Sequence, residues 1–180
     1  MTCTIKLINY CPVKSLSFQS INSCQIKKNL GMPNDRIFAF SRGIDPEKAK
    51  TIEKNPKERK LNNFLTLKNS PVLNKYNFSY KGNKLTLILD GEEIISISAD
   101  DQNEKSSLSK KLFELESTLI NPIILLKNTE YPFYDTSHSN NVFNSISLIN
   151  LNSIKDFENK IEEDVEFQRF RGNLYVDGIS

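Results

Sequence analysis

The sequence predicts a mainly β fold with minor α content. Most of the chain consists of short segments in which apolar and polar residues alternate, as in residues 4–7 (TIKL), and this alternation indicates half-buried strands. Turn pairs such as Asp90-Gly91 separate neighbouring segments, which is typical of consecutive strands in a sheet. Apolar residues recur at helical spacing only near residues 108–119 and 154–161, so helices are expected to be the minority.

In the first forty residues the alternation predicts three strands joined by loops. Pro12 has no backbone N–H for a sheet ladder, so the first strand should end before it and leave Lys14 and Ser15 in a loop with free backbone amides. A Gly/Pro/Asn turn over residues 29–34 leads to Asp35-Arg36, which precedes the third strand. The expected strands are residues 2–10, 20–26 and 37–40.

The middle of the chain predicts a solvated excursion and then a meander. Residues 44–63 are dominated by Lys, Glu, Asn and Pro, with one helical turn expected at 46–52. Glycine-containing turns at Lys81-Gly82-Asn83 and Asp90-Gly91 separate the strands of a three-stranded meander. The further strands expected here are residues 64–68, 77–80, 85–89 and 94–98.

Residues 101–180 carry both expected helices. The leucine stripe at 108–119 should begin at an N-cap serine, Ser106 or Ser107, and a second helix should begin at Asn150 or Asn152. A loop at 131–144 is long enough to suggest a functional role. The strands expected here are residues 122–126, 146–149 and 174–176. We therefore predict two domains, 1–100 and 101–180.

The totals exclude several classes of protein. A formal net charge of +2 gives no reason to expect a partner that is a nucleic acid or a membrane surface. No apolar run approaches the roughly 18 residues that span a bilayer. Three cysteines without a CxxC pair favour a reduced, cytoplasmic compartment. The single histidine, His138, has no second histidine to complete a zinc site, so we expect no metal ligand here.

Arginine placement points to candidate binding residues. The chain has 19 lysines and only 5 arginines, yet three of the arginines lie in two short segments, at Arg36 and at 169–171. Arginine differs from lysine in its planar fork, which matches phosphate and carboxylate groups. Arg171 precedes Gly172 and Asn173 at the start of a strand, so a fork, a close backbone approach and an amide are presented together. The alternative for Arg36 is a simple ion pair with Asp35.

Several of these segments together resemble the MOSC family, the proteins with homology to the C-terminal domain of molybdenum-cofactor sulfurase, which include the mitochondrial amidoxime-reducing component and bacterial relatives. The resemblance is carried in order by 12–15 (PVKS), 35–36 (DR), 64–66 with Pro71, 147–154, and 170–173 (FRGN). It implies an N-terminal β-barrel-like domain followed by an incomplete MOSC β-barrel. Lys68 and Gly172 depart from the family, which usually has arginine and proline there.

The resemblance also implies the site residues. Lys14, Ser15 and Arg36 correspond to the residues that hold the pterin phosphate of the molybdenum cofactor in this family. Arg171 and Asn173 correspond to residues that face the cofactor. Phosphate favours charge-assisted donors, and a pterin edge favours the paired donor and acceptor of an amide, so the residue types suit these roles.

The catalytic part of the family site is expected outside this chain. In the family a cysteine well beyond the FRGN motif binds molybdenum or carries sulfur, which places it beyond Ser180, and Cys3, Cys11 and Cys24 do not match it. Cys11 could instead be a thiol of lowered pKa, because it lies near Lys14. No lysine lies in a context that favours a Schiff base, which argues against pyridoxal phosphate, another cofactor mentioned for the family.

Two functions follow as hypotheses. In the first, the full-length protein is an oxidoreductase that reduces N-oxygenated or sulfoxide-type substrates with electrons from an iron-sulfur, flavin or cytochrome partner, or it is a carrier of cofactor sulfur. In the second, the chain is a non-catalytic module that binds a phosphate-bearing ligand or partner. The sequence beyond Ser180 distinguishes the two, because only the first requires the cysteine.

Overall fold

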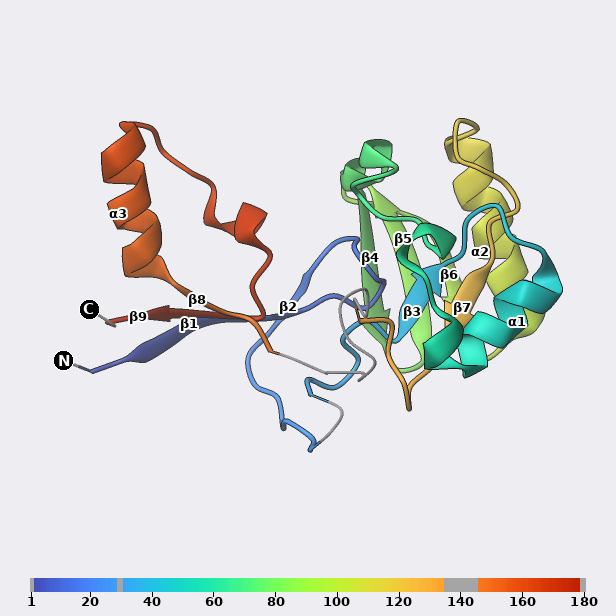
Figure 1. Ribbon diagram of the computed structural model, residues 1–180, viewed down its shortest axis with the longest axis horizontal. Coiled ribbons are helices and arrows are strands. Elements are labelled where there is room, and N and C mark those ends of the chain that lie inside the picture. Colours follow the sequence, from blue (N-terminus) through green and yellow to red (C-terminus); the bar gives the residue numbers. More distant parts are fainter. Residues whose placement is uncertain (1, 29–30, 135–145, 179–180) are drawn as a thin grey trace.

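The molecule has two halves, and strand β1 (Thr4–Tyr10) connects them. The computed structural model describes residues 2–28, 31–134 and 146–178, and in it nine strands form three sheets, with three α-helices (Figure 1). The mainly β class with minor α content is therefore confirmed. Among the described residues none of the three sheets closes into a barrel.

The first sheet joins the two ends of the chain. Its order is β2-β1-β9-β8, and β1 pairs antiparallel with both β2 and β9, whereas β8 runs parallel to β9. The two termini consequently lie side by side at one end of the molecule (Figure 1). The strands are β1 (Thr4–Tyr10), β2 (Gln19–Ile21), β8 (Leu148–Asn150) and β9 (Leu174–Asp177).

The other two sheets form the second half of the molecule with α1 and α2 (Figure 1). One is the predicted meander, in the order β4-β5-β6, and the other is the antiparallel pair β3-β7. Their apolar faces share a core with α2 that includes Phe38, Tyr76, Leu85 and Leu112. The bounds are β3 (Phe38–Phe40), β4 (Tyr76–Lys81), β5 (Lys84–Leu89), β6 (Glu92–Ser98) and β7 (Leu125–Lys127).

The helices begin at side-chain caps, and one cap differs from the prediction. The predicted turn at 46–52 is part of α1 (Pro46–Lys54), and Asn150 caps α3 (Leu151–Ile161) as predicted. However, α2 (Gln102–Leu115) begins at Asp101, whose carboxylate accepts hydrogen bonds from two first-turn amides. The serines proposed as caps lie inside this helix, where Ser106 and Ser107 donate to carbonyls one turn earlier.

Two predicted strands are shortened or lost. Residues 64–68 form no strand, because only Phe64 bridges Ser41, and Thr66 and Asn69 then close a turn through reciprocal hydrogen bonds. The strand predicted at 20–26 is limited to β2. Part of the loop predicted at 131–144, including His138, lies outside the described residues.

Packing crosses the predicted boundary between residues 100 and 101. The largest core cluster extends from Val13 to Leu125, and β7 pairs with β3. The first sheet in turn combines strands from both ends of the chain. Whether 1–100 and 101–180 fold independently is a separate property, so this division stays a prediction.

Candidate functional site

The loop that follows β1 is fixed by hydrogen bonds from both sides. The Cys11 amide donates to the Asp35 carboxylate at 2.7 Å, and the Cys11 carbonyl accepts from the Arg36 amide at 2.6 Å. Further along, the Lys14 amide donates to the Phe38 carbonyl at 2.8 Å. This loop (11–16) is therefore held in place between the two halves of the molecule. Four of the five predicted site residues belong to it or contact it, and Asn173 instead bonds Asn9, at the end of β1, and Ser147.

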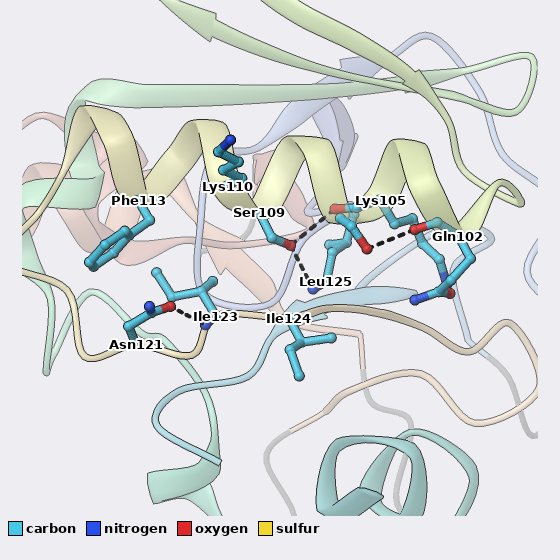
Figure 2. A pocket seen from close by; sticks show the side chains of 10 residues that line it. Gln102, Lys105, Ser109, Lys110, Phe113, Asn121, Ile123, Ile124 and Leu125 are labelled. Atoms are coloured by element: carbon cyan, nitrogen blue, oxygen red, sulfur yellow. Dashed lines mark hydrogen bonds between the residues drawn. The ribbon is translucent and has the colours of Figure 1, made fainter. Parts of the chain in front are cut away.

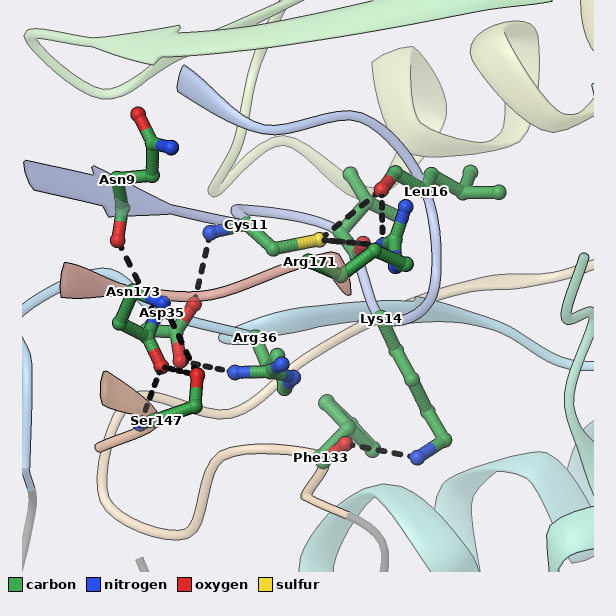
Figure 3. Close-up of polar contacts among 11 residues, drawn as sticks. Asn9, Cys11, Lys14, Leu16, Asp35, Arg36, Phe133, Ser147, Arg171 and Asn173 are labelled. Atoms are coloured by element: carbon green, nitrogen blue, oxygen red, sulfur yellow. Dashed lines mark hydrogen bonds and ion pairs between the residues drawn. The ribbon is translucent and has the colours of Figure 1, made fainter. Parts of the chain in front are cut away.

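Lys14 is turned inward rather than into solvent. Its residue is 5% exposed, and its Nζ donates to the Phe133 carbonyl at 3.1 Å (Figure 3). The same ammonium lies 5.8 Å from the centroid of the Phe64 ring. A lysine held this way presents a desolvated positive charge close to Phe133.

Arg36 contacts Tyr134, the residue that follows Phe133 in the chain. Its guanidinium pairs with the Asp35 carboxylate and lies 5.4 Å from the centroid of the Tyr134 ring. The ion pair expected as the alternative for Arg36 is thus present, and the Asp35 carboxyl is buried at 1% exposure while the Arg36 side chain is 22% exposed. The arginine therefore keeps access to a ligand while its charge is held in place.

Tyr134 places a buried hydroxyl next to Arg36 and Asp35. Its side chain is buried, and the Asp35 carboxylate is the nearby acceptor for its hydroxyl, although no hydrogen bond of ordinary geometry is formed among the described residues. Burial raises the pKa of Tyr134 well above its usual range, the Asp35 carboxylate raises it further through its charge and as a hydrogen-bond acceptor, and Arg36 lowers it. A buried hydroxyl that is paired this weakly can donate to a ligand acceptor at a gain in hydrogen bonding.

Arg171 lies on the opposite side of the loop. One of its terminal nitrogens donates to the Leu16 carbonyl at 2.6 Å and lies 3.9 Å from the Cys11 sulfur (Figure 3). The guanidinium carbon also lies 4.7 Å from the centroid of the Phe18 ring. Cys11 thus lies between Arg36 and Arg171, and both lower its pKa. Burial has the larger effect and raises the pKa of this thiol to about 11, so the prediction of a lowered-pKa thiol is wrong.

The Asn173 side chain joins neighbouring strands through hydrogen bonds. It is 1% exposed, its amide nitrogen donates to the Asn9 carbonyl at 3.1 Å, and its Oδ1 accepts from the amide and the hydroxyl of Ser147 at 3.1 and 2.9 Å. These bonds hold β9 against β1 and against the chain that leads into β8 (Figure 3). In this conformation the amide is used for internal hydrogen bonding.

Three of the five predicted site residues have a left-handed backbone conformation. Among the described residues, seven that are not glycine have positive φ, and Ser15, Arg36 and Arg171 are three of them, at 63°, 54° and 55°. The other four are Asn34, Asn83, Asp90 and Glu162. Asn and Asp tolerate this region, whereas serine and arginine are strained there by about 1 kcal/mol or more. Such strain concentrates at functional sites, which marks these three positions.

The five residues surround one loop but do not share one described cavity. Lys14 and Arg36 meet at the Phe133–Tyr134 segment, while Arg171 borders a cavity of about 510 Å³ on the other side of the loop. None of the other four predicted residues lines that cavity. In the structure, therefore, Lys14 and Arg36 lie at one segment, and Arg171 borders the cavity on the other side of the loop. Asn173 is used for internal hydrogen bonds.

A second cavity, of about 220 Å³, lies between α2 and the chain entering β7 (Figure 2). Its polar groups serve packing. Ser109 donates to the Lys105 carbonyl and accepts from the Leu125 amide, which joins the helix to the strand. The Lys105 ammonium lies 3.8 Å from the Glu53 carboxylate, so its charge is balanced. This arrangement gives no reason to expect a ligand.

The described part of the chain contains no group of three or more side chains suited to hold a metal ion. None of its helices is long and apolar enough to cross a bilayer.

Comparison of the chain with protein-family models, with curated protein sequences and with solved structures gave no match. The MOSC resemblance consequently rests on the sequence motifs alone.

Sequence reasoning missed the residue that anchors the Phe133–Tyr134 segment. Arg59 lies in the stretch predicted to be a solvated excursion, but it is buried and donates to the carbonyls of Tyr131 and Pro132, and to two carbonyls near the end of α1. Its guanidinium also lies 4.1 Å from the Phe133 ring centroid. The only available signal was the arginine itself, in a segment otherwise rich in lysine.

Proposed function

We propose that this chain binds a phosphorylated ligand through Lys14, Ser15 and Arg36, and that the ligand is the molybdenum cofactor of a MOSC protein. The observation that carries the proposal is the convergence of Lys14 and Arg36, from separate segments, on the adjacent residues Phe133 and Tyr134. Two cations held this close to one short segment are suited to one phosphate group.

The surroundings of these cations support an anion rather than a neutral ligand. The Phe133 carbonyl and the Asp35 carboxylate occupy the two cations in the structure, and a phosphate offers stronger acceptors in the same directions. The Tyr134 hydroxyl, which has only the Asp35 carboxylate as a nearby acceptor and no bond of ordinary geometry, supplies one more donor. The strained backbone at Ser15 and Arg36 is explained if those side chains are needed at those positions.

The proposal extends to the architecture that the resemblance implies. We propose that the β2-β1-β9-β8 sheet belongs to the incomplete MOSC β-barrel. Its support is that β8 forms the edge of this sheet among the described residues and is accompanied by exposed apolar side chains, namely Leu148, Phe157 and Phe170, at 53%, 45% and 42% exposure. Such an edge favours further pairing.

The metal end of the cofactor is not matched by the described residues. Cys11 is the described thiol between the two arginines, but it is buried at 0% exposure and its sulfur donates to the Val13 carbonyl, so it does not present a thiolate to a ligand. When bound, the cofactor supplies oxygen-atom and electron transfer. We derive no such step from these residues, and we propose that reduction of N-oxygenated substrates or sulfur transfer, and the docking of a redox partner protein, depend on a cysteine outside residues 1–180.

The same observation favours a second candidate, a non-catalytic module that binds a phosphate-bearing ligand. Such a module requires Lys14 and Arg36 but no thiolate, which fits a protonated Cys11. The two candidates share the anion site and differ in whether the ligand is the pterin.

Pterin content tests the proposal. The chain is purified from a host that makes the molybdenum cofactor, and bound pterin is measured by fluorescence after oxidation. We expect bound pterin in the wild type, a loss of ~10-fold or more in Lys14→Gln/Arg36→Gln, and no change in the control Lys50→Gln, whose side chain is exposed and pairs with Glu47. Absence of pterin overturns the cofactor assignment. Pyrophosphate binding that is lost in the double variant would then establish the module.

A further inference from the structure

A cavity that the proposed phosphate site does not use lies on the far side of loop 11–16. It measures about 510 Å³, within the range of small-molecule sites. One wall is the short helix η4 (Phe167–Phe170) and the residues around it, and the opposite wall is the start of β4 and the turn before it. The cavity thus lies between the two halves of the molecule and is separate from Lys14 and Arg36.

The wall at η4 carries two guanidinium groups. Arg169 and Arg171 both line the cavity, together with one carboxylate, Glu166. Arg171 is positioned from two directions, by its hydrogen bond to the Leu16 carbonyl and by stacking on Phe18. Arg169 is exposed and has no such constraint in its side chain. The local charge is therefore net positive, with one fixed cation and one adjustable cation.

The opposite wall and the floor have different chemistry. Asn74 and Asn77 present exposed amides, each of which offers a donor and an acceptor. The floor is apolar: Leu16, Leu73 and Tyr76 lie beneath it at 1% exposure or less, and its open surface comes from the half-buried Phe18 and Leu67. An inorganic ion would use the arginines alone and leave this floor in contact with water. A ligand with an apolar body would cover the floor and gain from its burial.

We propose that this cavity binds a small aromatic carboxylate, a class of ligand that the phosphate site does not take. The carboxylate pairs with Arg169 and Arg171, because two guanidinium forks match its geometry. The ring lies on the floor beside Phe18, and the amides of Asn74 and Asn77 accommodate polar substituents on the ring. The site stands independently of the molybdenum cofactor, because its lining does not include the residues of the proposed phosphate site.

The test uses the full chain and two probes, benzoate and its neutral counterpart benzamide. Binding is followed by NMR shifts of the side-chain amide resonances of Asn74 and Asn77, with Ala exchanges at these positions used for assignment. For a probe of this size we expect a dissociation constant in roughly the millimolar range for benzoate. Benzamide should bind about 5-fold or more weakly, because it lacks the charge.

Three variants separate this site from the proposed phosphate site. Arg169→Gln should weaken benzoate about 3- to 10-fold without loss of fold, because Arg169 is exposed. Lys14→Gln should leave benzoate binding unchanged while it lowers pterin content, so failure of one proposal does not imply failure of the other. The control Lys50→Gln should change neither.

Three results would overturn the inference: no shifts at Asn74 and Asn77 up to ~50 mM benzoate, equal affinity for benzamide, or unchanged benzoate affinity in Arg169→Gln. Shifts confined to the apolar groove of β8 and α3, which includes Leu148 and Phe157, would overturn it as well.

Discussion

Replacement of Asn173 by alanine should destabilise the fold by about 2–4 kcal/mol. The side chain is buried, and its removal leaves the Asn9 carbonyl without the amide donor and Ser147 without its acceptor. Asn9 is itself buried, so its carbonyl cannot recover the bond from water, and an orphaned buried group costs about 1–3 kcal/mol. The partly exposed Ser147 amide is rehydrated and adds about 1 kcal/mol.

Urea unfolding followed by circular dichroism measures this change, with the slope m unchanged between variants. For a chain of 180 residues the loss corresponds to a fall in Tm of roughly 5–15 °C. Ser147→Ala is the matched control, because it removes only the bonds of the Ser147 hydroxyl, one donated to Asn173 Oδ1 and one accepted from the Asn173 backbone amide. The Asn173 backbone amide still donates to the Ser147 carbonyl, and the substitution should cost about 1 kcal/mol or less. The reasoning is refuted if Asn173→Ala lies within about 0.5 kcal/mol of the wild type, since the amide would then be free to serve a ligand directly.

Three further predictions follow. The pKa of the Cys11 thiol is raised from 9.0 to about 11, so the folded state holds its proton more tightly. Stability should therefore fall as pH rises through 9 to 11, by up to about 3 kcal/mol, and this part of the pH profile should flatten in Cys11→Ala; an identical profile would contradict the assignment. Arg59→Met should cost about 3–4 kcal/mol in urea unfolding, because four backbone carbonyls lose a buried donor, and a cost under 1 kcal/mol would count against this anchor. Gly172→Ala should cost about 1–3 kcal/mol in the same assay, because a Cβ there would lie 2.5 Å from the Ile149 side chain, and unchanged stability would show that Ile149 moves freely.

The elements that the sequence predicted best are those specified by neighbouring residues. The meander from β4 to β6 was predicted because glycine-containing turns lie between alternating strands, and both turns are present with left-handed residues at Asn83 and Asp90. Helix α3 was predicted from Asn150 and the apolar spacing that follows it. In both cases the information lies within a few residues of the element.

The elements that were missed depend on distant contacts. The pairing of β1 with β9 joins the two ends of the chain, and no local pattern specifies it. Residues 64–68 alternate like a strand, but only Phe64 and Leu65 pair with the chain at the end of β3, and the side chains of Thr66 and Asn69 stabilise a turn after them. The N-cap of α2 was misplaced because Ser106 and Asp101 both have cap-forming side chains, and only the geometry selects between them.

The candidate site shows the same division. The residue types at Lys14, Arg36 and Arg171 were recognisable, because arginine is rare in this chain and the motifs are short and local. Their partners were not recognisable. Phe133 and the Tyr134 hydroxyl are brought to the cations by Arg59, which holds the preceding residues from a segment far away in sequence.

Loop 11–16 lies between the two proposed ligand sites and between the two halves of the molecule. On one side Lys14 and Arg36 meet the Phe133–Tyr134 segment, and on the other the Leu16 carbonyl holds Arg171 beside the second cavity. The loop therefore borders both proposed sites, although the residues that line them differ. Ser15, Arg36 and Arg171 share a left-handed backbone conformation, and each bends the chain sharply where its side chain must point at the loop or out of it. Glycine would relieve the strain at these positions, but it would remove the side chain.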